Sequence, residues 1–308
     1  MPYQAVHPVN ADGLTQIDLR ELIALRGQAL RLRAGAAKTR TAMAGAHTTH
    51  LRGRGMDYAE SRAYQAGDDA RAIDWRRTAR SGKPHTKLFR EERERSLLLL
   101  IDTHATMRFG TRVRFKSVQA ARAAAIAAWS AVRGGDRVGA LAFGGVRDAV
   151  TPHGGVRGAL GVLGAMARWD ARGSEEAEPL SGALQRARRL SLPGSRVLLI
   201  SDGQCCDARA RATLTRLTKH VEVRVLIVVD ALESMPPAPG SYAFETTSGR
   251  VSADFHSAAA RLRFRDMLGA GHRALATVCD TSGVHWRRIA TGEDPAPAIA
   301  ALLNPKPR

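Results

Sequence analysis

From residue 96 onward, short apolar runs alternate with longer stretches of helical periodicity. The runs are Leu97–Asp102, Arg137–Phe143, Arg196–Ser201 and Val221–Val229. Runs of this length and composition are typical of strands buried on both faces of a sheet. The stretches between them have the length of the crossover helices that parallel strands need in order to pair. The sequence therefore predicts an α/β fold with a doubly wound, mostly parallel sheet.

Helices are expected between and after these strands. Their apolar residues recur at helical spacing, and the Ala-rich stretch that follows the first strand stops at the pair Gly134 and Gly135. The predicted helices cover residues 113–132, 156–169, 180–190, 208–219, 257–276 and 297–303. Residues 147–151 are predicted as an edge strand or hairpin, and residues 285–289 as a last strand.

The first 95 residues have a different pattern. Residues 15–33 carry apolar side chains at helical spacing and predict an amphipathic helix. Residues 51–90 mix Gly, Arg, Asp and aromatic residues without a period, which indicates short strands and tight turns. We therefore predict two domains. Residues 1–95 form a helix and an Arg/Asp-rich β/turn subdomain, and residues 96–308 form the α/β domain.

The chain is strongly basic, with a net charge of +18. Clustered Lys and Arg attract phosphate, so a nucleic-acid-binding protein is one alternative. The Arg residues are spread along the whole chain, and aromatic residues that would stack on bases make up only 5% of it. An acidic protein surface or lipid headgroups suit the charge equally well.

No apolar run approaches the roughly 20 residues of a membrane-spanning helix. Residues 1–13 lack the basic and apolar segments of a secretory signal. Cys205, Cys206 and Cys279 form an odd set without metal-knuckle spacing, and they are expected to be reduced thiols. We therefore expect a protein of cytoplasmic location without a membrane span.

Two carboxylates, Asp102 and Asp202, follow predicted buried strands directly. In doubly wound sheets, ligands bind in the crevice at the carboxyl ends of the strands, where the strand order reverses. Each Asp alone is explained equally well as a helix cap or a turn residue. Together they indicate a candidate site at this edge of the sheet.

The residues around both carboxylates resemble those of a known fold family. The segment Asp102–Met107, with Gly110 after it, is similar to the Asp-x-Ser-x-Ser-Met segment of von Willebrand factor A domains, and Ser201–Gly203 resembles their later acidic loop. The block Arg62–Trp75, continuing to Arg80, is similar to the hallmark of the domain of unknown function 58 family. This resemblance implies a von Willebrand factor A-like fold. It also implies an association with MoxR-type AAA+ ATPases in a chaperone-like or complex-maturation role.

In such domains the resemblance implies a metal-ion-dependent adhesion site, in which hydroxyls and carboxylates hold Mg²⁺ and a partner's carboxylate completes the shell. Asp102, Thr106 and Asp202 match this pattern. His104 replaces a Ser, and Glu178 stands where a Thr belongs, although imidazole is a poor Mg²⁺ ligand. Three interpretations remain open: a site that has lost its metal, with His104 hydrogen-bonded to the carboxylates; a weak Mg²⁺ site; or a transition-metal site that includes His104 and Glu178.

The Arg and Asp block of residues 62–80 has two interpretations. One is a network of ion pairs and turns that locks the N-terminal subdomain to the sheet, with Trp75 as a packing anchor. The other is a docking surface, because Arg and Trp are favoured interface anchors. The candidate partner-binding residues are Arg62, Arg71, Asp74, Trp75 and Arg80.

The sequence lacks the nucleophile, phosphate-loop and metalloprotease motifs of common enzymes. We therefore predict a non-enzymatic protein-interaction module with a degenerate metal site, and a MoxR-type AAA+ ATPase or another protein with an acidic loop as its partner. Besides nucleic-acid binding, the alternative is a metal-dependent phosphoesterase that uses Asp102 and Asp202.

Overall fold

The computed structural model describes residues 12–32, 56–65, 68–91, 95–172, 177–192, 194–246 and 249–303. The chain divides into a larger unit, Met1–Gly35 with Arg95–Arg308, and a smaller unit, Ala36–Glu94. The predicted 1–95 subdomain needs correction, because helices α1 (Leu19–Ala24) and α2 (Arg26–Arg31) belong to the larger unit. Their apolar side chains Leu22 and Ala29 are buried in its core, and short amphipathic helices are stable only when such a face is covered.

The larger unit is built on a six-stranded sheet with the order β10-β7-β6-β3-β4-β5. Its strands are β3 (Ser96–Asp102), β4 (Arg137–Phe143), β5 (Asp148–His153), β6 (Arg196–Ser201), β7 (Glu222–Val229) and β10 (His285–Ala290). All neighbours pair in parallel except β5, which runs antiparallel to β4. Every residue of β3 is buried, which explains why this strand reads as a continuous apolar run. The predicted fold class is confirmed.

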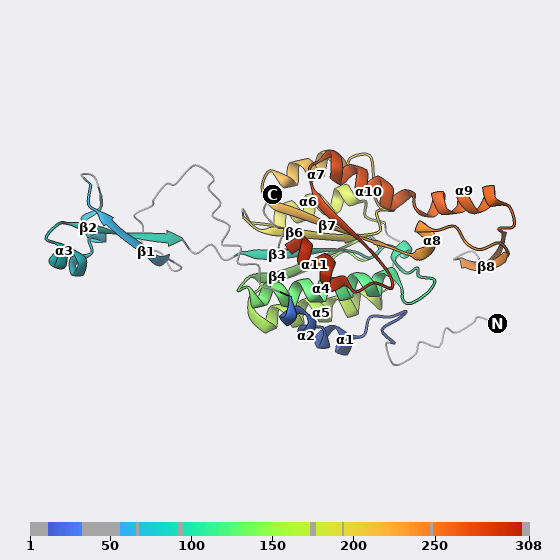
Figure 1. The fold of residues 1–308 in the computed structure, drawn as a ribbon, viewed down its shortest axis with the longest axis horizontal. Helices are drawn as coiled ribbons and strands as arrows, with labels where there is room; N and C mark the ends of the chain where they lie inside the picture. The colour runs from blue at the N-terminus through green and yellow to red at the C-terminus, as the bar shows by residue number, and fades with distance from the viewer. Residues whose placement is uncertain are drawn as a thin grey trace. The chain divides into compact units, whose positions relative to one another are not determined.

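Helices cover both faces of this sheet (Figure 1). One face packs against α1, α2, α4 (Lys116–Arg133), α5 (Gly155–Asp170) and α11 (Pro295–Leu303). The other packs against α6 (Leu180–Leu190), α7 (Ala210–Thr218) and α10 (Ala270–Thr281). The Ala-rich sequence of α4 allows a close approach, since its alanines from Ala120 to Ala128 are almost completely buried.

The strand order places a topological switch point in the middle of the sheet. The chain enters at β3, proceeds to β4 and β5 on one side, and then returns to β6 on the other side of β3. The crossovers after β3 and β6 therefore leave in opposite directions and open a crevice between the two strand ends. Asp102 is the last residue of β3, and Asp202 directly follows β6.

The sequence predicted one helix over residues 257–276. The structure has two helices there, α9 (Ala258–Leu268) and α10, and Gly269 separates them. Gly269 lies so close to the preceding helix α8 (Ala231–Ser234) that a Cβ there would be 2.9 Å from the Glu233 carbonyl oxygen. The region before α9 forms a hairpin of β8 (Ser241–Thr246) and β9 (Gly249–Asp254).

The smaller unit contains the antiparallel pair β1 (Met56–Ala63) and β2 (His85–Glu91). A 3-10 turn, η1 (Ala70–Ala72), and helix α3 (Trp75–Ser81) lie between them in sequence. The sequence interpretation missed α3. Its signals are local: the Asp74 carboxylate accepts from the Arg77 backbone N–H at the helix start, and Gly82 ends the helix with a left-handed φ of 69°.

Candidate functional site

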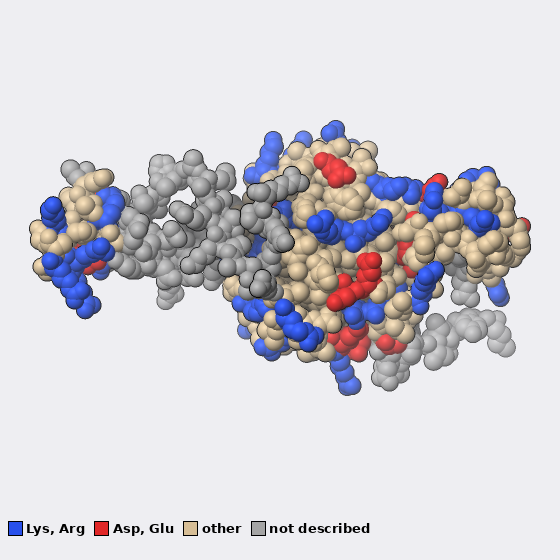
Figure 2. Space-filling model, in the orientation of Figure 1, with Lys and Arg blue, Asp and Glu red and all other residues tan. Residues whose placement is uncertain are grey.

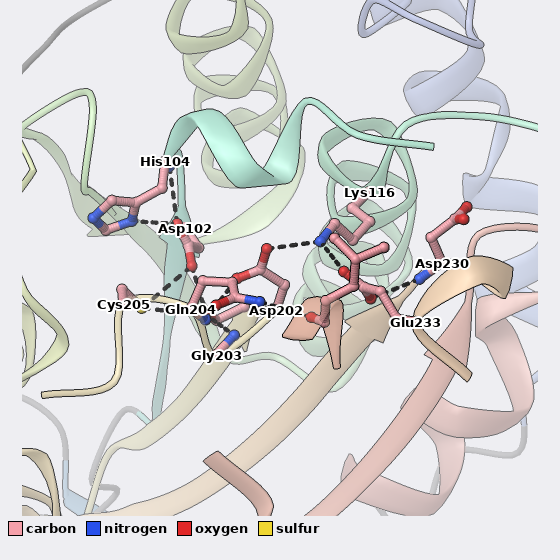
Figure 3. Close-up of polar contacts among 11 residues, drawn as sticks. Asp102, His104, Lys116, Asp202, Gly203, Gln204, Cys205, Asp230 and Glu233 are labelled. Carbon is pink, nitrogen blue, oxygen red and sulfur yellow. Dashed lines mark hydrogen bonds and ion pairs between the residues drawn. The ribbon is translucent and has the colours of Figure 1, made fainter. Parts of the chain in front are cut away.

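Asp102 lies at the centre of the candidate site, and its carboxylate is fully engaged (Figure 3). Oδ1 accepts from the His104 backbone N–H at 2.9 Å and lies 2.7 Å from His104 Nδ1. Oδ2 accepts from the Ser201 hydroxyl at 2.5 Å and from the Cys205 thiol at 3.4 Å. The side chain is completely buried, so these bonds replace its hydration. Asp102 therefore joins the loop after β3 to the loop after β6.

His104 is held in this position by its surroundings. Its ring packs edge-on against Phe143, and Gly144 lies beside it with φ of 93°. A Cβ at Gly144 would be 2.3 Å from His104 Nδ1, so the ring requires a glycine there. Burial by itself lowers the pKa of His104. The hydrogen bond and charge of Asp102 together with the charge of Asp202 outweigh burial, and the pKa is raised.

Asp202 is paired with a buried cation of the chain itself. Lys116, at the start of α4 and 1% exposed, donates from Nζ to Asp202 Oδ2 at 2.8 Å and to Glu233 Oε1 at 2.6 Å. Figure 3 shows its ammonium between the two carboxylates. Burial alone lowers the pKa of Lys116, but the charges of Asp202 and Glu233 raise it, so the lysine stays protonated. Asp202 Oδ1 accepts from the Gln204 backbone N–H.

The sequence interpretation did not identify Lys116 or Glu233. Glu233 belongs to the capping box of α8, where its Oε2 accepts from the Asp230 backbone N–H. A Lys at the start of a helix and a Glu in a capping box are ordinary surface features. Only the packing of α4 and α8 against the end of β6 brings them to Asp202.

Of the remaining predicted metal ligands, Thr106 is exposed and Glu178 is engaged by arginines. Thr106 lies in the 3-10 turn η2 (Ala105–Met107), and it is exposed. Glu178 forms an ion pair with Arg186 at 2.5 Å, and its other oxygen lies 3.8 Å from Arg147 Nε. These residues do not fit Mg²⁺, which requires six oxygen ligands. The side-chain atoms next to the Asp102 carboxylate include an imidazole nitrogen and a thiol sulfur, which Mg²⁺ does not favour, and the Lys116 ammonium lies against Asp202 Oδ2.

The predicted partner-binding residues lie in the smaller unit, where Arg62 and Asp74 have side-chain partners. Arg62 pairs with Asp68 at 2.7 Å, and Asp74 accepts from the Ser61 hydroxyl at 2.8 Å. Trp75 is 70% exposed, so it packs little within the smaller unit. Arg71 and Arg80 are also exposed.

An open cleft lies at the carboxyl edge of the sheet next to Glu233. It has a volume of about 650 Å³ and is lined by Glu233, Ser234, Arg265, Asp266, His272, Arg273 and Arg288. Asp266 accepts from Arg265 at 2.7 Å, whereas Arg288 has no ion pair among the described residues. On the face drawn in Figure 2, Lys and Arg form several separate groups with Asp and Glu between them. The cleft thus gathers three arginines around one hollow.

The His104–Asp102 bond predicts a pH dependence of stability. Because the folded pKa of His104 lies above its usual value of about 6.5, the protonated ring stabilises the fold fully below that pH, and this contribution is lost as the pH rises through the folded pKa. We expect His104→Gln to destabilise the protein most near pH 6 and progressively less above it. Urea unfolding of both proteins between about pH 6 and about pH 8.5 measures this.

The control is His256, whose Nδ1 lies 2.6 Å from Asp254 in the same Asp-x-His arrangement but with both side chains largely exposed. Solvent screens that pair, so His256→Gln should leave the pH profile unchanged. A difference between wild type and His104→Gln that is flat over this range would contradict the role assigned to the buried pair.

The strand order, the Asp102 loop after the central strand and the Ser201–Gly203 loop after its neighbour define a von Willebrand factor A-type α/β domain. Residues 60–274, well over half of the chain, match the family described as protein of unknown function DUF58. The chain belongs to this family.

Curated relatives match over a shorter region. The uncharacterized proteins Rv1480 of Mycobacterium tuberculosis and Mb1516 of Mycobacterium bovis are each 40% identical over 97 residues. The match covers 32% of this chain and 31% of each relative. The chain therefore matches less than a third of the length of these relatives.

Among solved structures, BatB from Bacteroides thetaiotaomicron is 14% identical with a TM-score of 0.42, and the match covers 68% of this chain and 97% of BatB. An aerotolerance-related membrane protein from Bacteroides fragilis is 16% identical with a TM-score of 0.42, covering 68% of this chain and 96% of that one. A von Willebrand factor type A protein from Catenulispora acidiphila is 12% identical with a TM-score of 0.35, covering 61% and 44%.

The predicted cytoplasmic location is wrong, because it is contradicted by the descriptions of these structural neighbours. The Bacteroides fragilis structure is described as a membrane protein, and a further one, from Vibrio fischeri, as a membrane spanning protein. Among the described residues, no helix is both long and apolar enough to cross a membrane.

Proposed function

We propose that this chain is a non-enzymatic protein-interaction module that binds an acidic segment of a partner protein at the carboxyl edge of its sheet. The observation that carries the proposal is the open, arginine-lined cleft beside Glu233. Arg forks bind carboxylates in two-pronged geometry, and three of them around one hollow match a segment with several Asp or Glu side chains.

The charges around the cleft favour an acidic ligand. The Lys116 ammonium offsets one of the two charges of Asp202 and Glu233, and Asp266 is bound by Arg265, so the repulsion of an incoming anion by these carboxylates is reduced. Arg273 and Arg288 are exposed, and the whole chain carries a charge of +18. Such a field also speeds the encounter with an acidic partner.

The same edge lacks the features of a catalytic centre in the part of the chain that the structure describes. Burial and the Asp102 charge raise the pKa of the Cys205 thiol well above its usual value, so it stays protonated and is a weak nucleophile. Both carboxylates are occupied by donors, which leaves no free base beside it. This supports a binding role over the phosphoesterase alternative.

A MoxR-type AAA+ ATPase is the partner we propose, because the Arg62–Arg80 block resembles that of MoxR-associated proteins. An ATPase loop rich in Asp and Glu would enter the cleft without needing Mg²⁺ to bridge two carboxylates. The proposed role is assembly or maturation of a complex, in which the module presents or holds the ATPase's client.

Binding to a purified MoxR-type ATPase tests this proposal. We expect Arg288→Glu to weaken the affinity by at least roughly tenfold, because it reverses a charge that contacts the acidic segment. Calorimetric titration at two salt concentrations measures the change, and the wild-type affinity should fall as salt rises.

Arg287→Glu is the matched control. Arg287 and Arg288 are consecutive in β10 and both exposed, but Arg287 pairs in register with Leu226 on one sheet face and Arg288 with Ile227 on the other. The two variants change the net charge equally. Equal binding by both, or no binding by wild type, would contradict the proposal. A loss on Trp75→Ala alone would place the contact on the smaller unit instead.

A further inference from the structure

Three side chains with metal-binding atoms converge beside the central strand. The ligand atoms of Asp102, His104 and Cys205 all lie within 4.8 Å of one another. His104 Nδ1 lies 2.7 Å from Asp102 Oδ1, and Cys205 Sγ lies 3.4 Å from Oδ2. Figure 3 shows the imidazole and the thiol both directed at the Asp102 carboxylate, where they meet different oxygens. The cluster joins loops that are about a hundred residues apart in sequence.

We propose that Asp102, His104 and Cys205 form a zinc-binding site. Carboxylate, imidazole and thiolate are the three ligand types that Zn²⁺ takes in proteins, at about 2.0 to 2.3 Å. Mg²⁺ accepts neither a ring nitrogen nor sulfur readily, so the donor set that fails for Mg²⁺ suits a softer ion. The site differs from the transition-metal interpretation of the sequence, since Glu178 and Asp202 are held by Arg186 and Lys116 and Cys205 takes their place.

The existing contacts preorganise the three ligands. Asp102 is bridged to both neighbours by protons, one on His104 Nδ1 and one on the Cys205 thiol. A zinc ion takes the place of these two protons and needs only small shifts of the side chains. One carboxylate and one thiolate also balance the charge of Zn²⁺, so the buried site stays neutral.

The surroundings supply the second layer of contacts that zinc sites use. Ligating histidines and carboxylates in zinc sites are usually oriented by further hydrogen bonds. The Ser201 hydroxyl and the His104 backbone N–H orient the carboxylate.

Cobalt(II) titration of the metal-stripped full-length protein tests the site, because Co²⁺ occupies zinc sites and a thiolate ligand gives it an intense charge-transfer absorption. We expect one equivalent to bind with this band and to be displaced by Zn²⁺. Cys205→Ser should remove the band and weaken binding by roughly 100-fold. His104→Gln should keep a thiolate band but weaken binding similarly.

Cys206→Ser is the matched control, since Cys206 is the next residue and lies outside the cluster. It should leave both the band and the affinity unchanged. Thermal unfolding of each variant verifies that it is folded. If Cys205→Ser does not fold, the metal affinity of His104→Gln tests the site instead. No binding by wild type, or a band that persists in Cys205→Ser or disappears in Cys206→Ser, would overturn the proposal. The measurement needs no partner protein, so it stands apart from the proposed function.

Discussion

Lys116→Met should destabilise the larger unit by about 3 to 5 kcal/mol, because it leaves Asp202 and Glu233 as buried negative charges without their cation. Methionine fills a volume similar to that of lysine. The loss of unfolding free energy therefore measures the removal of the charge and not the creation of a cavity. Urea unfolding followed by circular dichroism measures the free energy. Lys219→Met, at an exposed lysine, should change it by less than about 0.5 kcal/mol.

A second substitution separates the charge effect from packing. Glu233→Gln removes one of the two negative charges and keeps an oxygen that can accept from the Asp230 backbone N–H. In the Lys116→Met background it should recover at least about 1 kcal/mol, although in the wild-type background it is destabilising. A cost below about 1 kcal/mol for Lys116→Met alone would mean that water reaches the two carboxylates.

Gly203→Ala should cost at least about 3 kcal/mol, because two penalties act at one residue. Gly203 has φ of 83°, and a Cβ there would be 2.4 Å from the Gly271 carbonyl oxygen. Backbone cannot move aside as a side chain does, so the loop that carries Asp202 and Cys205 must shift. The free energy of urea unfolding measures the loss.

Gly135→Ala is the control for this substitution. Gly135 has an almost identical φ of 82° with nothing near its Cβ position, so its variant reports the conformational cost alone, about 1 kcal/mol. The difference between the two variants isolates the contact between the β6 loop and α10. If both cost the same, the loop is not held against α10 as the structure has it.

The sheet could be predicted because its signals are local. The run Leu97–Ile101 is apolar throughout, since strands covered on both faces have no polar side, and β4, β6 and α6 have the predicted bounds. The break of helix 257–276 at Gly269 could not be predicted. Gly269 also lies against the Glu233 carbonyl oxygen, more than thirty residues earlier in the chain, and no local pattern indicates this contact.

For the candidate site, the sequence alone determined that Asp102 and Asp202 each follow a buried strand directly and that His104 stands where a hydroxyl is expected. Only the tertiary structure decided what these groups contact. It places the Lys116 ammonium at Asp202 and the Cys205 thiol at Asp102, and it puts Glu178 beside Arg186. Strand ends are set by short-range patterns, whereas side-chain partners are set by how distant helices and loops pack, and the balance of charge and hydrogen bonds at a buried site depends on those partners.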